Sequence, residues 1–110
     1  MKSWNRAWGL VPVFVCACAI FTAGAGDAAK GKDLFDRRCV ACHGALGDGN
    51  KAIADMFQVT MRPLSSKEVQ GQDNAVLKEI VLEGRGKMKP VGVSETEADD
   101  IVAFLRSLKK

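Results

Sequence analysis

Five consecutive residues, Cys39-Val40-Ala41-Cys42-His43, constrain this chain more than any other part of its sequence. On a helical turn, residues three apart project from the same side, so both thiols and the neighbouring imidazole would meet one edge of whatever they hold. Two sulfurs and an imidazole at this spacing can attach a porphyrin covalently and ligate its iron. The C-x-x-C-H order is the pattern of c-type haem attachment. It predicts one haem c, with thioether bonds to Cys39 and Cys42 and with His43 as an iron ligand.

The first 25 residues have the composition of a cleavable secretory signal peptide. Lys2 and Arg6 form a short positive region, residues 10–21 form an apolar run, and residues 23–25 (Ala-Gly-Ala) offer a small-residue cleavage site. The run is shorter than the roughly 20 apolar residues that span a membrane. We therefore predict export to the periplasm, cleavage after residue 25, and no stable membrane insertion thereafter. The alternatives are an uncleaved anchor and a lipoprotein acylated at Cys18.

Residues 26–110 form a single predicted domain with few residues for a core. Apart from His43, its aromatic side chains are Phe35, Phe57 and Phe104. Domains of this size often need a metal or cofactor for stability, and a porphyrin would supply the missing apolar mass. All but two of the 16 basic residues remain in this domain against 13 acidic ones, and they are spread along the chain. Such a balance gives no indication of a nucleic-acid partner.

Other interpretations of the motif need features that this domain lacks. A thioredoxin-like pair would follow a strand in a βαβ unit, and no run before Cys39 has the alternation of a strand. A structural zinc site needs four ligands, whereas residues 26–110 offer two cysteines and one histidine. A disulfide between Cys39 and Cys42 could form in an oxidising compartment, but this interpretation gives His43 no role.

The remaining patterns predict an all-α domain. A helix over 27–40 would be N-capped by Asp27, with Gly31, Leu34 and Phe35 facing inward. The other predicted elements are a glycine-rich loop over 44–49, a short helical turn over 52–57, a loop around Pro63 and residues 65–66, a helix over 74–83 that Asp73 caps and Gly84 ends, and an open loop over 84–93.

The last predicted helix has the strongest local pattern. Ser94 and Glu97 have the spacing of a capping box, in which each side chain satisfies an exposed backbone donor of the other residue. Apolar residues then recur every three or four positions on one face: Ala98, Ile101, Val102, Phe104, Leu105 and Leu108.

The ligand on the far side of the iron is expected to be a methionine, because His43 is the only histidine. Met88 is favoured, since it lies in a loop whose glycines let the backbone approach a flat ring and whose Pro90 keeps the preceding residue extended. Met61 lies close to His43 in the sequence, and Met56 falls on an apolar helical face where a core role is expected. An open or water-ligated iron is the further alternative. Cys39, Cys42, His43 and Met88 are expected to line one apolar cavity.

The sequence from about residue 28 to 108 resembles the class I single-haem cytochromes c. The resemblance rests on Gly31 and Phe35, on CVACHG, on GRGKMKP and on DDIVAFLRSL. It implies three to four helices wrapped round one haem, with the first and last helices crossing so that Gly31 and Phe35 meet Ile101 and Phe104. Lys51 stands about where many bacterial members have a proline, which leaves open the carbonyl that accepts the ring N–H of His43. The usual Met-Pro pair is Met88-Lys89-Pro90 here.

These observations predict a carrier of single electrons, without enzymatic activity. An iron with both axial positions filled offers no open site to a substrate and changes oxidation state with little rearrangement. We expect a monomer whose partners are redox proteins, such as membrane respiratory complexes or periplasmic oxidoreductases, and Lys87 and Lys89 could meet an acidic patch on them. The alternatives are a haem module with a labile sixth ligand, acting as a gas or peroxide sensor or weak peroxidase, and an interaction module of a respiratory complex.

Overall fold

The computed structural model describes residue 9 and residues 12–17 and 26–110. Residue 9 and residues 12–17 have no regular secondary structure. Half of the predicted apolar run, residues 10–11 and 18–21, lies outside the described residues, as do the predicted small-residue cleavage site and Cys18. None of the helices in the part that is described has the length and apolar character to cross a membrane.

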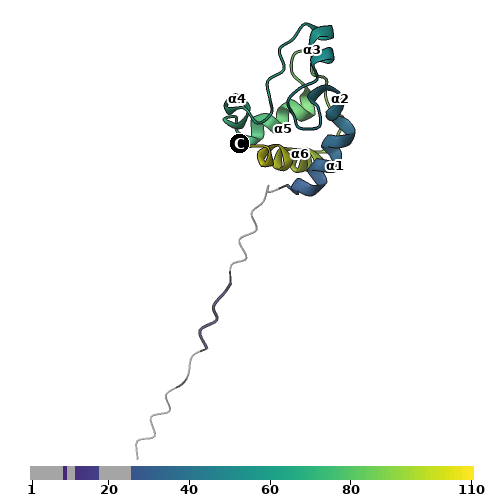
Figure 1. Ribbon diagram of the computed structural model, residues 1–110. Helices are drawn as coiled ribbons and strands as arrows, with labels where there is room; N and C mark the ends of the chain where they lie inside the picture. Colours follow the sequence, from purple (N-terminus) through teal and green to yellow (C-terminus); the bar gives the residue numbers. More distant parts are fainter. Residues whose placement is uncertain (1–8, 10–11, 18–25) are drawn as a thin grey trace, which may run out of the picture.

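Six helical segments make up the domain (Figure 1). They are α1 (Ala28–Arg38), α2 (Val40–His43), α3 (Lys51–Phe57), α4 (Lys67–Gln70), α5 (Asn74–Glu83) and α6 (Glu95–Ser107). No strand occurs among the described residues, and one isolated bridge joins Arg85 to Met88. The predicted all-α class is confirmed. There are more segments than the three to four expected, because α2 and α4 are single turns of four residues.

The helix predicted over 27–40 is divided in two. Asp27 caps α1 as expected, because its carboxylate accepts from the backbone N–H groups of Ala29 and Lys30 at 2.9 and 3.2 Å. The helix ends at Arg38, and Cys39 leaves helical geometry with φ −120° and ψ −30°. Helical structure resumes at Val40. Since residues 38–40 contain no glycine or proline, the sequence pattern gave no indication of this break.

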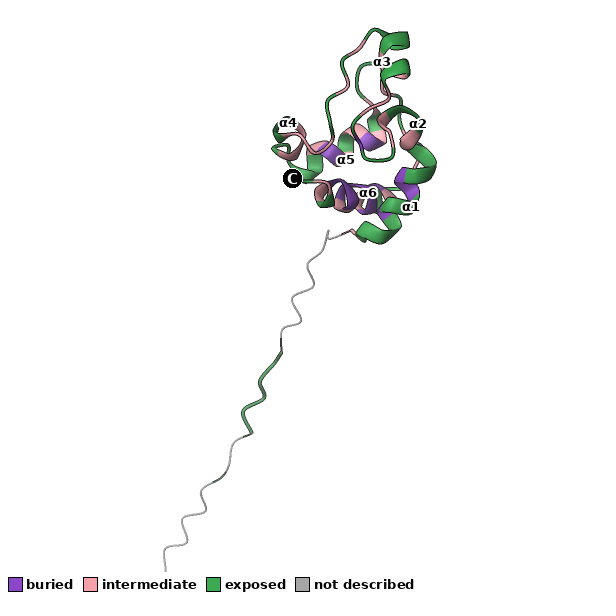
Figure 2. Ribbon diagram, viewed as in Figure 1, coloured by how far each residue is buried: buried purple, intermediate pink, exposed green. Residues whose placement is uncertain are grey.

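The core forms where α1 crosses α6 (Figure 2). The rings of Phe35 and Phe104 lie 5.0 Å apart between centroids and are tilted by 52°. Gly31 is buried against α6, and Ile101 is one of the two largest fully buried side chains. The predicted meeting of the first and last helices is confirmed. The buried cluster comprises Leu34, Phe35, Val81, Ala98, Ile101, Phe104 and Leu105.

Helix α5 also packs against α6 and has the predicted bounds. Leu77 and Val81 are its buried residues. Asp73 occupies the N-cap position, but its side chain makes no capping hydrogen bond, so this part of the expectation is wrong. Lys78 joins the two helices through Asp99, with its Nζ 3.1 Å from a carboxylate oxygen. The predicted capping box of α6, between Ser94 and Glu97, is present.

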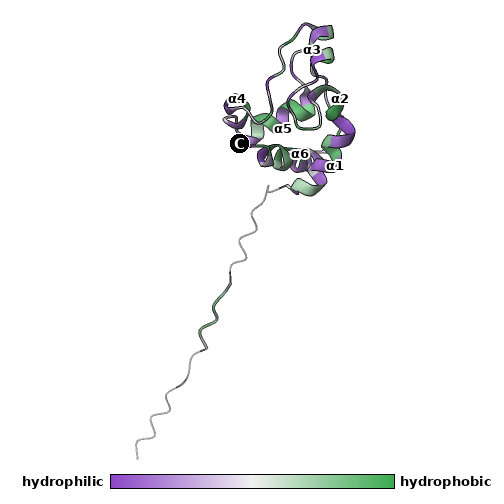
Figure 3. Cartoon of the chain, in the orientation of Figure 1, coloured by the Kyte–Doolittle hydropathy of each residue, from purple (hydrophilic) through white to green (hydrophobic). Residues whose placement is uncertain are grey.

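Helix α3, like the single turn α4, lacks extensive packing against another helix. Met56 is 65% exposed and Phe57 is 41% exposed. The core role expected for Met56 is therefore wrong in this structure. Figure 3 shows apolar residues on α3 as well as on α2 and α5. The apolar side chains of α3 are thus available to a further group.

Candidate functional site

The motif residues lie at the junction of α1 and α2. Cys39 is half-buried at the break, Cys42 is exposed, and His43 is half-buried at the end of α2. The turn is held by hydrogen bonds from the backbone N–H groups of Cys42 and His43 to the carbonyl of Cys39, at 3.2 and 2.9 Å. Both motif cysteines are free thiols. The structure therefore brings two free sulfurs and one imidazole together on a single turn.

Burial favours the neutral forms of two of these groups. Desolvation, with a smaller contribution from Cys42, raises the pKa of the Cys39 thiol from 9.0 to about 11. Desolvation also lowers the pKa of the His43 imidazole below its ordinary value. A neutral imidazole has a free lone pair for a metal, so the surroundings of His43 favour its ligating form.

The two ring nitrogens of His43 have different surroundings. Nδ1 is buried and has no hydrogen-bond partner among the described residues, and Nε2 does not share this combination of burial and a missing partner. A metal-ligating histidine normally donates its second ring N–H to an acceptor. Lys51 is the first residue of α3, and its side chain pairs with Asp55 at 2.6 Å. Nε2 is therefore the nitrogen available to an iron, and Nδ1 lacks the usual support.

Asn50 supports the motif turn, a role that the sequence analysis missed. Its backbone N–H donates to the carbonyl of Cys42 at 2.9 Å, and its Nδ2 donates to the carbonyl of Ala41 at 3.3 Å. Its Oδ1 also caps α3 by accepting from Ala52 and Ile53. An asparagine directly before a helical run is a typical N-cap, so the capping role could have been read from the sequence. The contact of Asn50 with α2 could not have been read from the sequence, because it depends on how the loop over 44–49 folds back toward α2.

Met88 lies on a separate, tight turn that folds back over the end of α5. Its backbone exchanges two hydrogen bonds of 2.9 Å with Arg85. Gly84 makes the turn possible: its φ is +77°, and a Cβ at this position would lie 2.4 Å from the carbonyl oxygen of Met88. The Met88 side chain is half-buried between the exposed residues Lys87 and Lys89. The backbone that presents Met88 is therefore well fixed.

The other candidate, Met61, lies beside the loop that follows the motif. Its Cβ and Sδ are 3.0 and 3.7 Å from the position that a Cβ on Gly49 would occupy. Gly49 in turn donates its N–H to the carbonyl of His43 at 2.7 Å. Met61 thus packs against the segment that supports His43.

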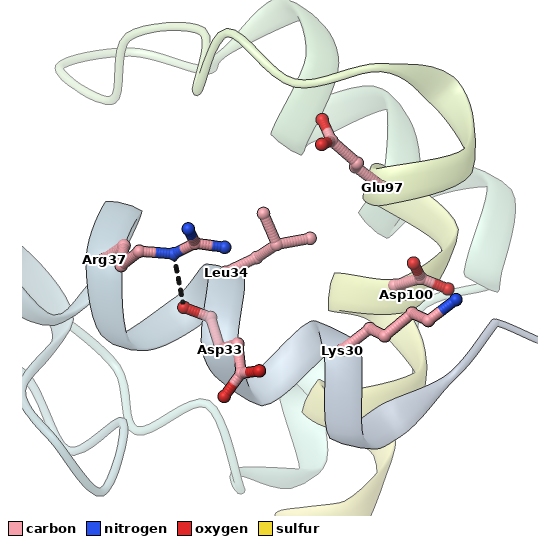
Figure 4. Close-up of a pocket in the computed structure, with 6 residues that line it drawn as sticks. All are labelled: Lys30, Asp33, Leu34, Arg37, Glu97 and Asp100. Carbon is pink, nitrogen blue, oxygen red and sulfur yellow. Dashed lines mark hydrogen bonds between the residues drawn. The ribbon is translucent and has the colours of Figure 1, made fainter.

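A pocket of about 200 Å³ lies elsewhere, lined by residues of α1 and α6 (Figure 4). Lys30, Leu34, Glu97 and Asp100 are among its lining residues. It contains none of the motif residues, so a cavity shared by Cys39, Cys42, His43 and Met88 stays a prediction.

An all-helical fold whose terminal helices cross, with a C-x-x-C-H turn that offers an open imidazole nitrogen, defines a class of protein that binds haem covalently. The family model for cytochrome c matches residues 28–109. The chain therefore belongs to the cytochrome c family and carries covalently bound c-type haem with its iron. The chemistry of this family is haem-based electron transfer.

Several curated relatives are similar over much of the chain. Cytochrome c-554(547) of Halothiobacillus neapolitanus is 34% identical over 77% of this chain and 100% of its own length. Cytochrome c-552 of Bradyrhizobium diazoefficiens is 34% identical over 92% of this chain and 93% of its own. The CcoP subunit of a cbb3-type cytochrome c oxidase from Azospirillum sp. is 41% identical over 62% of this chain, but the match spans only 23% of that subunit.

Two solved structures confirm the fold. The c-type cytochrome KustC0563 has a TM-score of 0.63 and 24% identity, over 73% of this chain and 98% of that one. Cytochrome cL from Hyphomicrobium denitrificans has a TM-score of 0.59 and 21% identity, over 80% of this chain and 51% of that one.

Proposed function

We propose that this protein is an exported carrier of single electrons, with one haem held by Cys39 and Cys42 and its iron ligated by His43 and Met88. The observation that carries the proposal is the motif turn, which brings together the side chains of Cys39 and Cys42, neither of them in a disulfide, and the imidazole of His43. When bound, the haem supplies an iron that alternates between two oxidation states. Cys39, Cys42 and His43 would hold it, and ligation by Met88 as well would leave the iron no position for a substrate.

The placement of the three methionines supports Met88 as the second ligand. Met61 packs against Gly49, next to the segment that supports His43, and therefore lies near the wrong ligand for a position across the iron. Met56 is largely exposed on α3. Met88 has a half-buried side chain on a turn that is separate from the motif and fixed by its own backbone hydrogen bonds.

The turn that carries Met88 also suggests how partners are recognised. Arg85, Lys87 and Lys89 are exposed on it, and no acidic residue occurs from Gly84 to Val93. Such a basic loop would accelerate encounter with an acidic surface near the haem without creating a stable complex. One relative is named as a subunit of a cytochrome c oxidase. We therefore include membrane respiratory complexes among the partners, with periplasmic oxidoreductases as the other class.

Export is part of the proposal, because haem attachment at C-x-x-C-H and the leader composition point to the same compartment. We propose that cleavage after Ala25 releases a monomeric domain of residues 26–110 into the periplasm. Intact mass spectrometry of the exported protein should give the mass of this chain plus one haem. A larger mass that retains the leader would support the uncleaved anchor instead.

Spectroscopy of the purified protein tests the electron-carrier proposal. The oxidised form should show the sulfur-to-iron charge-transfer band at the red end of the visible spectrum, take up one electron per haem reversibly, and largely refuse carbon monoxide. Ready binding of carbon monoxide, together with a missing charge-transfer band, would instead favour the sensor or weak peroxidase. The matched reference is a His/Met-ligated cytochrome c measured under the same conditions.

A further inference from the structure

Asp100 is a buried carboxylate at the α1–α6 crossing, with a side chain that no cation neutralises in the described part of the chain. The residue is 8% exposed. Its Oδ1 accepts from the backbone N–H of Asp27 at 2.7 Å. The ion pairs of the described residues do not include it. Because a buried charge costs free energy unless it is compensated, a carboxylate with a single neutral donor favours a cationic partner.

The backbone just before α1 lies directly on α6. A Cβ at Gly26 would be 2.1 Å from the carbonyl oxygen of Asp99 and 2.6 Å from the backbone nitrogen of Asp100. These are backbone atoms inside a helix and cannot move aside. Only glycine fits at position 26, so this residue belongs to the crossing and is not part of a loose linker.

The nitrogen of Gly26 must lie close to the Asp100 carboxylate. The nitrogen of Asp27 is 2.7 Å from Oδ1 of Asp100. Successive backbone nitrogens are at most about 3.7 Å apart, given standard bond lengths and angles, so the nitrogen of Gly26 is within about 6.4 Å of Oδ1. Opposite charges at roughly this separation stabilise each other measurably.

The neighbouring carboxylates already have partners. The Asp27 carboxylate caps α1, and Asp99 pairs with Lys78 of α5 at 3.1 Å. Glu97 accepts from the backbone N–H of Ser94 at 2.9 Å. Lys30 lines the same pocket as Asp100 and extends toward it in Figure 4, but it forms no ion pair there. Asp100 is therefore the acceptor left for a charge that arises at Gly26.

We infer that removal of the leader completes the α1–α6 crossing, because cleavage after Ala25 creates an α-ammonium group on Gly26 that pairs with the carboxylate of Asp100. The inference rests on the cleavage proposed above. Before cleavage this nitrogen is a neutral amide; afterwards it carries a positive charge beside a buried negative one. Processing would thus change the stability of the haem domain as well as its location.

The test uses the mature holoprotein, residues 26–110 with haem, and measures the α-amine directly by NMR titration. Its pKa should lie above the ordinary value of about 7.7–8.0, because the Asp100 carboxylate favours the charged form. A raised pKa stabilises the fold at pH values below the ordinary value, and this contribution is lost as the pH rises through the raised pKa. The denaturant midpoint should fall over this interval.

Two altered proteins identify the pairing. Asp100→Asn keeps an acceptor for the N–H of Asp27 but removes the charge, and it should return the α-amine pKa to its ordinary value. Selective transamination of the α-amine to a carbonyl removes the ammonium group and leaves the lysines intact, so the fall in midpoint should disappear. Glu79→Gln, at an exposed position on α5, is the matched control and should retain the raised pKa.

The possible results separate this inference from the proposal on which it rests. If the exported protein does not begin at Gly26, both the cleavage site and the pairing in the cell are wrong. If it does begin there and the α-amine pKa is the same in wild type and Asp100→Asn, the pairing alone is overturned. An exported protein that begins at Gly26 and has a raised α-amine pKa that depends on Asp100 supports both.

Discussion

Gly31 lies where α1 crosses α6, and the space beside its Cα is filled by the backbone of α6. A Cβ at this position would be 1.9 Å from the carbonyl oxygen of Asp100 and 2.9 Å from the Cβ of Phe104. The residue has ordinary helical geometry, so glycine is required there for close approach and not for backbone freedom. This single position sets how closely the two terminal helices approach.

Gly31→Ala should destabilise the holoprotein by about 3 kcal/mol or more, measured by denaturant unfolding, because α6 cannot move without losing the contact of Phe35 with Phe104. At an exposed helical position, alanine would instead stabilise by about 0.5–1 kcal/mol relative to glycine. An unchanged or raised midpoint would therefore show that the helices do not approach this closely.

A second residue-scale prediction concerns Met88. Met88→Ala should lose the sulfur-to-iron band and leave the iron high-spin or water-ligated. It should also lower the reduction potential, on the order of 100 mV, because a thioether ligand favours the reduced iron. Carbon monoxide should then bind. The fold should persist, because the thioether bonds and His43 still hold the haem.

Met61→Ala is the matched control, since Met61 packs against Gly49 rather than on the turn of Met88. Its absorption spectrum and potential should stay close to those of the wild type. If Met61→Ala loses the charge-transfer band and Met88→Ala retains it, Met61 and not Met88 is the ligand.

At the scale of the elements, those with strong end signals were predictable from the sequence. The helix over 74–83 occurs as predicted because its apolar periodicity runs up to Gly84, which ends it. The capping box of Ser94 and Glu97 occurs as predicted because it depends on residues three apart in the sequence. The break at Cys39 and the short α4 were not predictable. The turn of Lys67–Gln70 has one local cap, from Ser66, and depends otherwise on contacts distant in sequence.

The same distinction between local and distant interactions applies to the candidate site. Cys39, Cys42 and His43 could be predicted because their chemistry depends on adjacency in the sequence. The missing acceptor for Nδ1 of His43 and the contact of Asn50 with Ala41 could not, because both depend on the path of the loop over 44–49. The choice of Met88 was based on the composition of its loop, and its role as a ligand is still a prediction.

Arg106 of α6, which is distant in sequence from α4, makes the hydrogen bonds that hold the segment around α4 against α6. Its Nη1 donates to the carbonyl of Gln70 at 2.7 Å, its Nε donates to Oδ1 of Asn74 at 2.8 Å, and its Nη2 donates to the carbonyl of Gln72. The side chain of Gln70 also donates to the carbonyl of Leu105 at 2.9 Å. A planar guanidinium serves several acceptors at once, which a lysine ammonium on a flexible stem does not reproduce.

Arg106→Lys should therefore destabilise the protein by about 1–3 kcal/mol and accelerate hydrogen exchange, above all in the segment 67–77. Arg37→Lys is the matched control, because the Nε of Arg37 bonds only to the carbonyl of Asp33 within its own helix, at 3.2 Å. Its effect should stay within about 0.5 kcal/mol. Uniform acceleration of exchange throughout the domain would mean that Arg106 does not act locally.

At the scale of the whole molecule, the protein core is small and lies to one side. The buried cluster occupies the crossing of α1 with α6 and the adjoining face of α5, with Phe35 and Phe104 as its aromatic residues. Helix α3 lacks comparable packing, and Met56 and Phe57 are exposed on it. A bound haem would give these side chains a partner, so stability should depend strongly on the cofactor.

The double variant Cys39→Ala/Cys42→Ala, which cannot attach haem, should consequently be largely unfolded. Far-ultraviolet circular dichroism should show little helix and no cooperative melt, because a core of this size does not by itself offset the conformational entropy of about 85 residues. The wild-type chain made without haem is the necessary control and should behave in the same way. If that control is folded and the double variant is not, the substitutions themselves cause the loss. If both show native-like dichroism and melt cooperatively, the crossing of α1 and α6 suffices for folding, and haem binding adds function to a domain that is already stable.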